Sequence, residues 1–154
     1  MTYSIRLATP GEEMTIALQR RRMFAEMGAV AYLEVEGMDE RFADWLRPKL
    51  ANREYLGWFA VSEAGEVVGG AGLLIREGAP HHRNFSTLRG YVMNVYVAPE
   101  HRHRGVAQLM ITALLDHCRV NGFPSISLHA SDAGKPLYES LGFEAANEMQ
   151  ISLV

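Results

Sequence analysis

The alternation of polar and apolar residues in the first third of the chain predicts one strand followed by two helices. Residues 4–8 alternate as a short strand does, and residues 9–12 have the composition of a helix start, with Thr9 as the cap and Pro10 in the first turn. We expect a helix from there to about Met27, a loop over residues 29–37 and a second helix that opens near Asp39. The apolar residues of the second helix share one face: Phe42, Trp45, Leu46 and Leu50.

The pattern changes to strands from residue 57 onward. Residues 58–61 and 67–75 flank a short Gly-containing turn, which predicts an antiparallel hairpin. A polar connection then leads to an apolar strand at 91–97. We expect a helix at 105–121, a strand at 125–130, a short helix at 133–141 and a last strand at 148–154. This order predicts a mixed α/β sheet with helices on its faces.

Length and charge narrow the class of protein. The 154 residues predict one domain, residues 1–154, with a single core. Fifteen Lys and Arg against eighteen Asp and Glu give a net charge of −3, without a block of five like charges. We therefore expect neither a nucleic-acid partner nor an anionic membrane partner.

Cysteine and histidine usage point to a reduced, metal-free protein. The lone Cys118 has no second cysteine for a disulfide or a cysteine-based zinc site. The pairs His81-His82 and His101-x-His103 have no carboxylates at ligand spacing, so we expect no metal. The first thirty residues contain no signal-peptide core and no long apolar run, which predicts a cytoplasmic location.

The candidate chemistry lies in residues 95–108, where a strand, a tight polar turn and a helix follow one another. The first N–H groups of a helix have no intrahelical acceptor, and the helix dipole favours negative charge there, so phosphate oxygens are natural ligands. Gly105 removes a Cβ from the approach, and Arg102 and Arg104 add positive charge. The alternative interpretation is a solvated basic turn before an ordinary core helix.

Two sequence blocks resemble the Gcn5-related N-acetyltransferase family. The block Arg102-x-x-Gly105-x-Ala107 fits the family's Arg/Gln-x-x-Gly-x-Gly/Ala signature, and residues 137–143 fit its Leu-Tyr-x-x-x-Gly-Phe block. The resemblance implies a mixed, mostly antiparallel central sheet of six or seven strands, about four flanking helices and splayed central strands. The earlier Gly70-Ala71-Gly72 has no third glycine and no following helix, so we interpret it as close strand packing and not as a dinucleotide site.

The resemblance implies acetyl transfer from acetyl-CoA to a primary amine of a small molecule or peptide, by direct attack in a ternary complex. Tyr138 would protonate the leaving thiolate, Ser131 would contact the cofactor, and the strand backbone would pair with the pantetheine amides. The strand residues are Val95, Tyr96 and Val97, and the diphosphate cradle comprises His103, Arg104, Gly105, Val106, Ala107 and Gln108 together with Arg102.

No sequence block identifies the general base or the acceptor site as clearly as the two blocks identify the cofactor site. Strand positions that hold a base in some relatives correspond to Tyr91 and Met93, neither of which is a carboxylate or an imidazole. His129 is one candidate, and a chain of waters is another. By analogy with the family, the acceptor would contact Phe24, Tyr32, Glu34 and Glu36, of which the two glutamates are further candidates for the base.

Two other functions stay open at this stage. The absence of a base on the strand is compatible with a non-catalytic acyl-CoA-binding or interaction module on the same fold. A transferase that uses another acyl-CoA or an oxygen nucleophile also fits the sequence. Dimers are common in the family, so a homodimer is one of the assemblies that the sequence leaves open.

Overall fold

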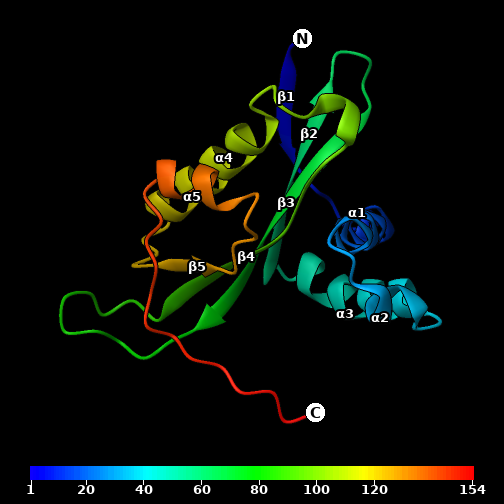
Figure 1. The fold of residues 1–154 in the computed structure, drawn as a ribbon. Helices are drawn as coiled ribbons and strands as arrows, with labels where there is room; N and C mark the ends of the chain where they lie inside the picture. The colour runs from blue at the N-terminus through cyan, green and yellow to red at the C-terminus, as the bar shows by residue number, and fades with distance from the viewer.

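The structure is a computed structural model that describes residues 1–154, and at its centre lies one five-stranded sheet of order β1-β2-β3-β4-β5 (Figure 1). The strands β1 to β4 are antiparallel to their neighbours, whereas β5 runs parallel to β4. Their bounds are β1 Tyr3–Leu7, β2 Tyr55–Ser62, β3 Val67–Glu77, β4 Leu88–Val97 and β5 Ile126–Leu128.

Helices cover both faces of this sheet. On one face lie α1 (Glu13–Glu26), α2 (Val30–Glu34) and α3 (Met38–Ala51), and on the other lie α4 (Val106–Val120) and α5 (Lys135–Ser140) (Figure 1). The helices on the first face pack on the sheet through a hydrophobic cluster around Leu46 and Phe59. Those on the second face pack through a larger hydrophobic cluster around Leu73, Met110 and Leu114. None of the helices combines the length and apolar character needed to cross a bilayer.

The structure confirms the predicted fold class and corrects three details. The sheet has five strands, not six or seven, because residues 148–154 have no strand partner. The strand predicted at 125–130 is shorter, Ile126–Leu128. The loop predicted at 29–37 contains the short helix α2, which is stabilised by stacking of Tyr32 on Phe24 rather than by any capping signal in its own sequence.

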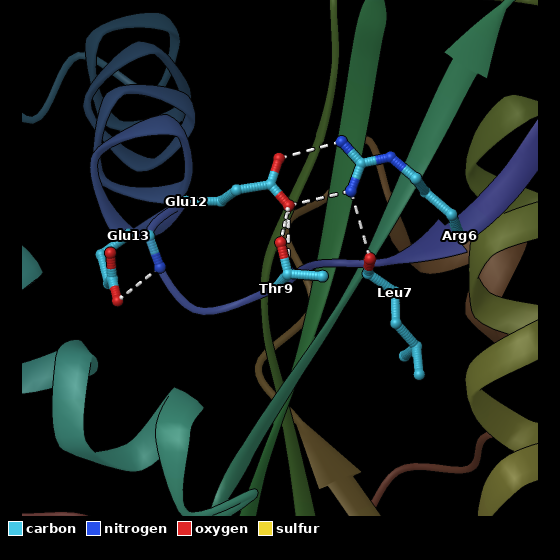
Figure 2. A network of polar contacts seen from close by, with 6 residues as sticks. Arg6, Leu7, Thr9, Glu12 and Glu13 are labelled. Carbon is cyan, nitrogen blue, oxygen red and sulfur yellow. Dashed lines mark hydrogen bonds and ion pairs between the residues drawn. The ribbon is translucent and has the colours of Figure 1, made fainter.

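The first helix also starts later than predicted, at Glu13 instead of near Thr9 (Figure 2). The Thr9 hydroxyl does not cap the helix; the Glu12 carboxylate accepts hydrogen bonds from the Thr9 N–H and hydroxyl at 2.9 Å. The same carboxylate accepts two hydrogen bonds from the Arg6 guanidinium, which lower the pKa of Glu12 to about 2. Glu12 therefore ties the end of β1 to the start of α1.

The glycines of β3 serve close packing, as the sequence predicted. A Cβ at Gly72 would lie 1.8 Å from the Tyr55 hydroxyl, and one at Gly70 would lie 2.2 Å from Gln19 Oε1. Both distances are far below van der Waals contact, so these positions leave space for the buried Tyr55 and Gln19 side chains.

Candidate active site between the diverging strands

A deep slot opens where β4 and β5 separate. The two strands pair only from Gly90 to Val92 on β4, opposite Ile126 to Leu128 on β5. Beyond that point the sheet is split, and a cavity of about 1150 Å³ follows the second half of β4. Residues from α1, the turn before α4, the end of β5 and α5 line the rest of the cavity.

A bulge in β4 shapes the wall of this slot. The pairing with β3 shifts between Gly70 and Gly72, and Asn94 within the bulge has a left-handed φ of 58°. The buried Asn94 side chain donates to the Tyr55 hydroxyl at 3.0 Å and accepts from Arg20 Nη1 at 2.7 Å. Residues 93–97 have no strand on their slot side, so an extended ligand with amide groups has a free strand edge to pair with.

At one end of the slot, the turn before α4 presents a row of free backbone donors. None of the six consecutive N–H groups from His103 to Gln108 bonds to an acceptor within the protein. His103 and Gly105 have left-handed φ values of 60° and 77°, which bend the chain into a concave arrangement of amides at the helix N-terminus. Such an arrangement binds anions, and its row of amides is long enough to fit a diphosphate.

The glycine of this turn leaves the approach open. A Cβ at Gly105 would meet no atom within 4 Å, and the position lies in the left-handed region that disfavours other residues. Arg104 is exposed, and its Nη1 contacts only Met1 Sδ, at 3.4 Å. Its guanidinium is therefore free to turn toward a bound phosphate.

The sequence predicted that Arg102 adds positive charge to the diphosphate cradle, but in the structure its guanidinium is paired with another residue. Its Nε donates to the Val97 carbonyl at 2.9 Å, and its Nη2 lies 2.6 Å from both carboxylate oxygens of Glu26 on α1. Both side chains are partly exposed, at 37% and 41%. The guanidinium thus links the turn to α1 across the mouth of the slot, and a phosphate contact would require it to leave Glu26.

Tyr138 lies on α5 with its ring against Phe143, at 5.8 Å between centroids in an edge-to-face arrangement. Its hydroxyl makes no hydrogen bond within the protein, and the residue lines the slot. Burial raises the pKa of Tyr138, so the hydroxyl keeps its proton at neutral pH. A protonated, unpaired hydroxyl beside the slot is suited to donate a proton.

Two other predicted residues also reach the slot. The Ser131 hydroxyl accepts the Gly134 N–H at 3.1 Å, which holds the turn before α5 and leaves its own proton free to donate. His129 follows β5, where Nδ1 contacts the Tyr91 hydroxyl and Nε2 lies 2.7 Å from Gln150 Nε2. Both ring nitrogens are therefore engaged, and His129 acquires a free basic lone pair only when one of these contacts breaks.

The residues predicted for the acceptor divide into two groups. Phe24 lines the slot and stacks on Tyr32 at 4.3 Å, but Tyr32 itself lies behind it, with its hydroxyl buried and unpaired. Glu34 and Glu36 are exposed outside the slot, so the structure does not bring them to the site. The slot also contains residues that the sequence analysis missed.

The missed residues are Arg20, Glu26 and Asn94. Arg20 lies over Phe24 and Phe42 at 4.7 Å from each ring, and no carboxylate pairs with it. An asparagine inside an apolar strand was a usable signal, because Asn is among the few residues that adopt a left-handed φ readily. The run Arg20-Arg21-Arg22 is most simply a polar helix face, with contact to an acidic acceptor or partner as the alternative, and no local signal marked Glu26. The structure contains no group of three or more His, Cys, Asp or Glu that could hold a metal ion.

Comparison with known proteins places this arrangement among known folds. The family profile described as "Acetyltransferase (GNAT) family" matches residues 19–143. The crystal structure of a GCN5-related N-acetyltransferase from Ralstonia eutropha JMP134 superposes with a TM-score of 0.88 at 32% identity, over 99% of both chains. That of a predicted acetyltransferase with acetyl-CoA from Clostridium acetobutylicum has a TM-score of 0.87 at 25% identity, over 99% of this chain and 97% of the other.

A curated relative is similar over a shorter stretch. The glucosamine 6-phosphate N-acetyltransferase of Trypanosoma brucei brucei is 32% identical over 95 residues. The match spans 62% of this chain and 62% of the relative.

Proposed function

The chain belongs to the acetyltransferase (GNAT) family and is an acyltransferase, and from that premise we propose that it transfers the acetyl group of acetyl-CoA to a primary amine. The acceptor in this proposal is a small molecule or a peptide, and the amine attacks directly while both substrates are bound.

The observation that supports this proposal most strongly is the row of six free N–H groups beside an unpaired strand edge. The amides of residues 103–108 fit a diphosphate, and the edge of residues 93–97 fits the amides of a pantetheine arm. Because one cavity joins both features, a single elongated ligand with a diphosphate and two amides matches the site. Coenzyme A has this chemistry.

Acetyl-CoA supplies a thioester, and different groups of the slot act on the thioester oxygen and on the thioester sulfur. We assign a backbone N–H near Val95, on the open edge of β4, to the thioester oxygen, where it stabilises the negative charge that develops during attack. The new C–N bond forms as the C–S bond breaks, and the Tyr138 hydroxyl gives its proton to the leaving sulfur.

The chain's single cysteine, Cys118, is not placed to form a covalent acyl-enzyme. Cys118 lies on the buried face of α4, outside the slot, and burial raises its pKa to about 11. The thiolate needed for attack is therefore scarce at neutral pH.

We assign removal of the amine proton to water. The carboxylate in the slot, Glu26, is paired with Arg102, and both nitrogens of His129 are engaged. The other two histidines of the slot, His101 and His103, lie at the diphosphate end, in the turn before α4. Without a dedicated base the enzyme favours amines that are partly neutral at pH 7. At that pH the neutral fraction of an α-amino group, with a pKa near 7.7, is far larger than that of a lysine-like amine, with a pKa near 10.4.

An acetylation screen with a panel of amines tests the proposal. The panel contains glucosamine 6-phosphate, an aminoglycoside, a polyamine, free amino acids and a peptide with a free N-terminus. We expect release of the CoA thiol and a product heavier by one acetyl group with at least one of them. Parallel reactions with propionyl-CoA and with hydroxyl analogues of the best amine separate the alternatives. No thiol release above the amine-free blank, from protein that binds coenzyme A, would refute amine acetylation.

A further inference from the structure

Arg20 is a positive charge on the wall of the slot that no negative charge of the protein compensates. Three residues of the slot are Arg, Lys, Asp or Glu: Arg20, Arg102 and Glu26. Glu26 pairs with Arg102, and none of the five ion pairs of the structure includes Arg20. Asp39, on the helix that packs against α1, pairs with Arg21 instead. A cation withdrawn from water without a counterion costs free energy, so a ligand that brings a negative charge to this wall is stabilised there.

The contacts of Arg20 hold its guanidinium in place but leave one edge of it free. The guanidinium carbon lies 4.7 Å from the ring centroids of Phe24 and Phe42, and Nη1 donates to Asn94 Oδ1 at 2.7 Å. Nε is buried without an acceptor, and Nη2 has no partner either but is not fully buried. Nε and Nη2 form one edge of the guanidinium, and their parallel N–H groups match the two oxygens of a carboxylate.

Arg20 also lies close to the place where the amine attacks. Its partner Asn94 precedes Val95, and we assign a backbone N–H in this part of the strand edge to the thioester oxygen. An anionic group held by Arg20 is therefore only a few bonds from the attacking nitrogen. The diphosphate of coenzyme A is assigned to residues 103–108, at the other end of the slot. The negative charge beside Arg20 consequently comes from the acceptor.

We propose that Arg20 binds a carboxylate of the acceptor, which makes the acceptor an amino acid whose amine lies a few bonds from that carboxylate. This inference rests on the proposed function and names the substrate class within it. The positive charge of Arg20 also favours the neutral, nucleophilic form of the amine, because a cation disfavours an ammonium ion beside it. Polyamines and aminoglycosides carry several positive charges, and they find no free carboxylate in the slot because Glu26 is paired with Arg102.

The preference for an acid over its amide tests the inference. The probes are alanine, methionine, phenylalanine and β-alanine, each beside its carboxamide, which keeps the amine and the side chain but lacks the negative charge. Titration calorimetry of the coenzyme A-bound protein measures their dissociation constants. The ratio kcat/KM, corrected for the neutral fraction of each amine, measures the same preference during acetylation. We expect at least one acid to be favoured over its amide by about tenfold or more in both measurements.

Variants of α1 then test whether Arg20 is the source of the preference. Arg20→Gln removes the guanidinium and is expected to abolish it, whereas Arg20→Lys is expected to retain part of it. The matched control is Arg22→Gln, which removes the same charge from an exposed side chain of α1 outside the slot and should leave the preference unchanged. A dissociation constant of coenzyme A that changes by less than about twofold shows that the slot of each variant is intact.

Equal affinity for acids and amides in the unaltered protein, or a preference that survives Arg20→Gln, overturns the inference. Tighter binding of the aminophosphonate analogue of alanine than of alanine itself would assign the site to phosphate-like groups and overturn it as well. Failure of the proposed function is distinguishable, because the calorimetric preference does not depend on catalysis. Acids that bind through Arg20 but release no CoA thiol would retain the carboxylate site and refute their acetylation.

Discussion

Glu26 and a bound diphosphate would compete for the same arginine at the mouth of the slot. Arg102 is hydrogen-bonded to both oxygens of Glu26 while its Nε holds the end of β4 through the Val97 carbonyl. A cofactor that draws Arg102 away must break this ion pair, whose partners are both partly exposed. Such pairs are weak, so the pair modulates affinity rather than blocking entry.

Glu26→Gln is therefore expected to tighten coenzyme A binding by about three- to tenfold at low salt, with a smaller gain at high salt. Titration calorimetry at two ionic strengths measures the effect. Glu100→Gln removes the same charge from an exposed side chain without an ion partner, on the turn between β4 and α4, and serves as the control. Equal gains from both variants would mean that net charge alone, and not release of Arg102, sets the affinity.

Gly105→Glu is expected to weaken coenzyme A binding by at least about tenfold. The new carboxylate repels the diphosphate, and backbone strain of about 1–3 kcal/mol favours a turn conformation other than the one that forms the cradle. Gly122→Glu is the matched control. Gly122 follows the other end of α4 with a φ of 72° against 77° for Gly105, and a Cβ meets no atom within 4 Å at either position. If both variants bind coenzyme A like the unaltered protein, the diphosphate assignment is wrong.

Tyr138→Phe removes a hydroxyl that makes no hydrogen bond and keeps the ring that packs on Phe143. We expect kcat to fall at least about tenfold, while the dissociation constant of coenzyme A changes by less than about twofold. Steady-state kinetics beside calorimetry separate the two quantities. An unchanged kcat would remove Tyr138 from the role of acid.

Among the elements, the junction of β1 and α1 depends on one carboxylate with a low pKa. Glu12 accepts hydrogen bonds from Arg6 and from Thr9, and the pKa of about 2 means that the folded state favours its ionised form (Figure 2). Its contribution to stability is complete above about pH 4.5, the ordinary pKa of glutamate, and is lost as the pH falls through about 2.

Glu12→Gln is accordingly expected to lower the free energy of unfolding by about 0.5–1 kcal/mol at pH 7, with no difference from the unaltered protein near pH 2. Urea denaturation across that pH range measures this difference. Glu54→Gln, at an exposed glutamate without a side-chain partner, should show no such pH dependence. A constant difference at every pH would assign the effect to packing and not to charge.

Elements with a local pattern were predictable from the sequence, and elements that depend on distant partners were not. The hairpin of β2 and β3, and α4 after its glycine turn, follow from turn residues and periodicity within a few positions. The helix α2 has five residues and is held by Phe24 from α1. The segment 148–154 has the pattern of a strand, but a strand forms only beside a partner.

At the scale of the whole molecule, the site arises where a split sheet meets a helix N-terminus. The sequence blocks at residues 102–107 and 137–143 identified the turn and Tyr138, because both depend on local backbone and on single residues. The contact of Asn94 with Arg20 and the pairing of Arg102 with Glu26 join residues more than seventy positions apart. Such contacts follow from the tertiary fold and leave no local signature.

The central claim is that residues 103–108 hold the diphosphate of coenzyme A, and titration calorimetry on the intact protein tests it most directly. We predict that coenzyme A binds with a dissociation constant between about 1 μM and 1 mM. Pantetheine, which lacks the diphosphate, should bind at least about tenfold more weakly. Equal affinity for the two ligands, or no heat from millimolar coenzyme A with folded protein, would contradict the claim.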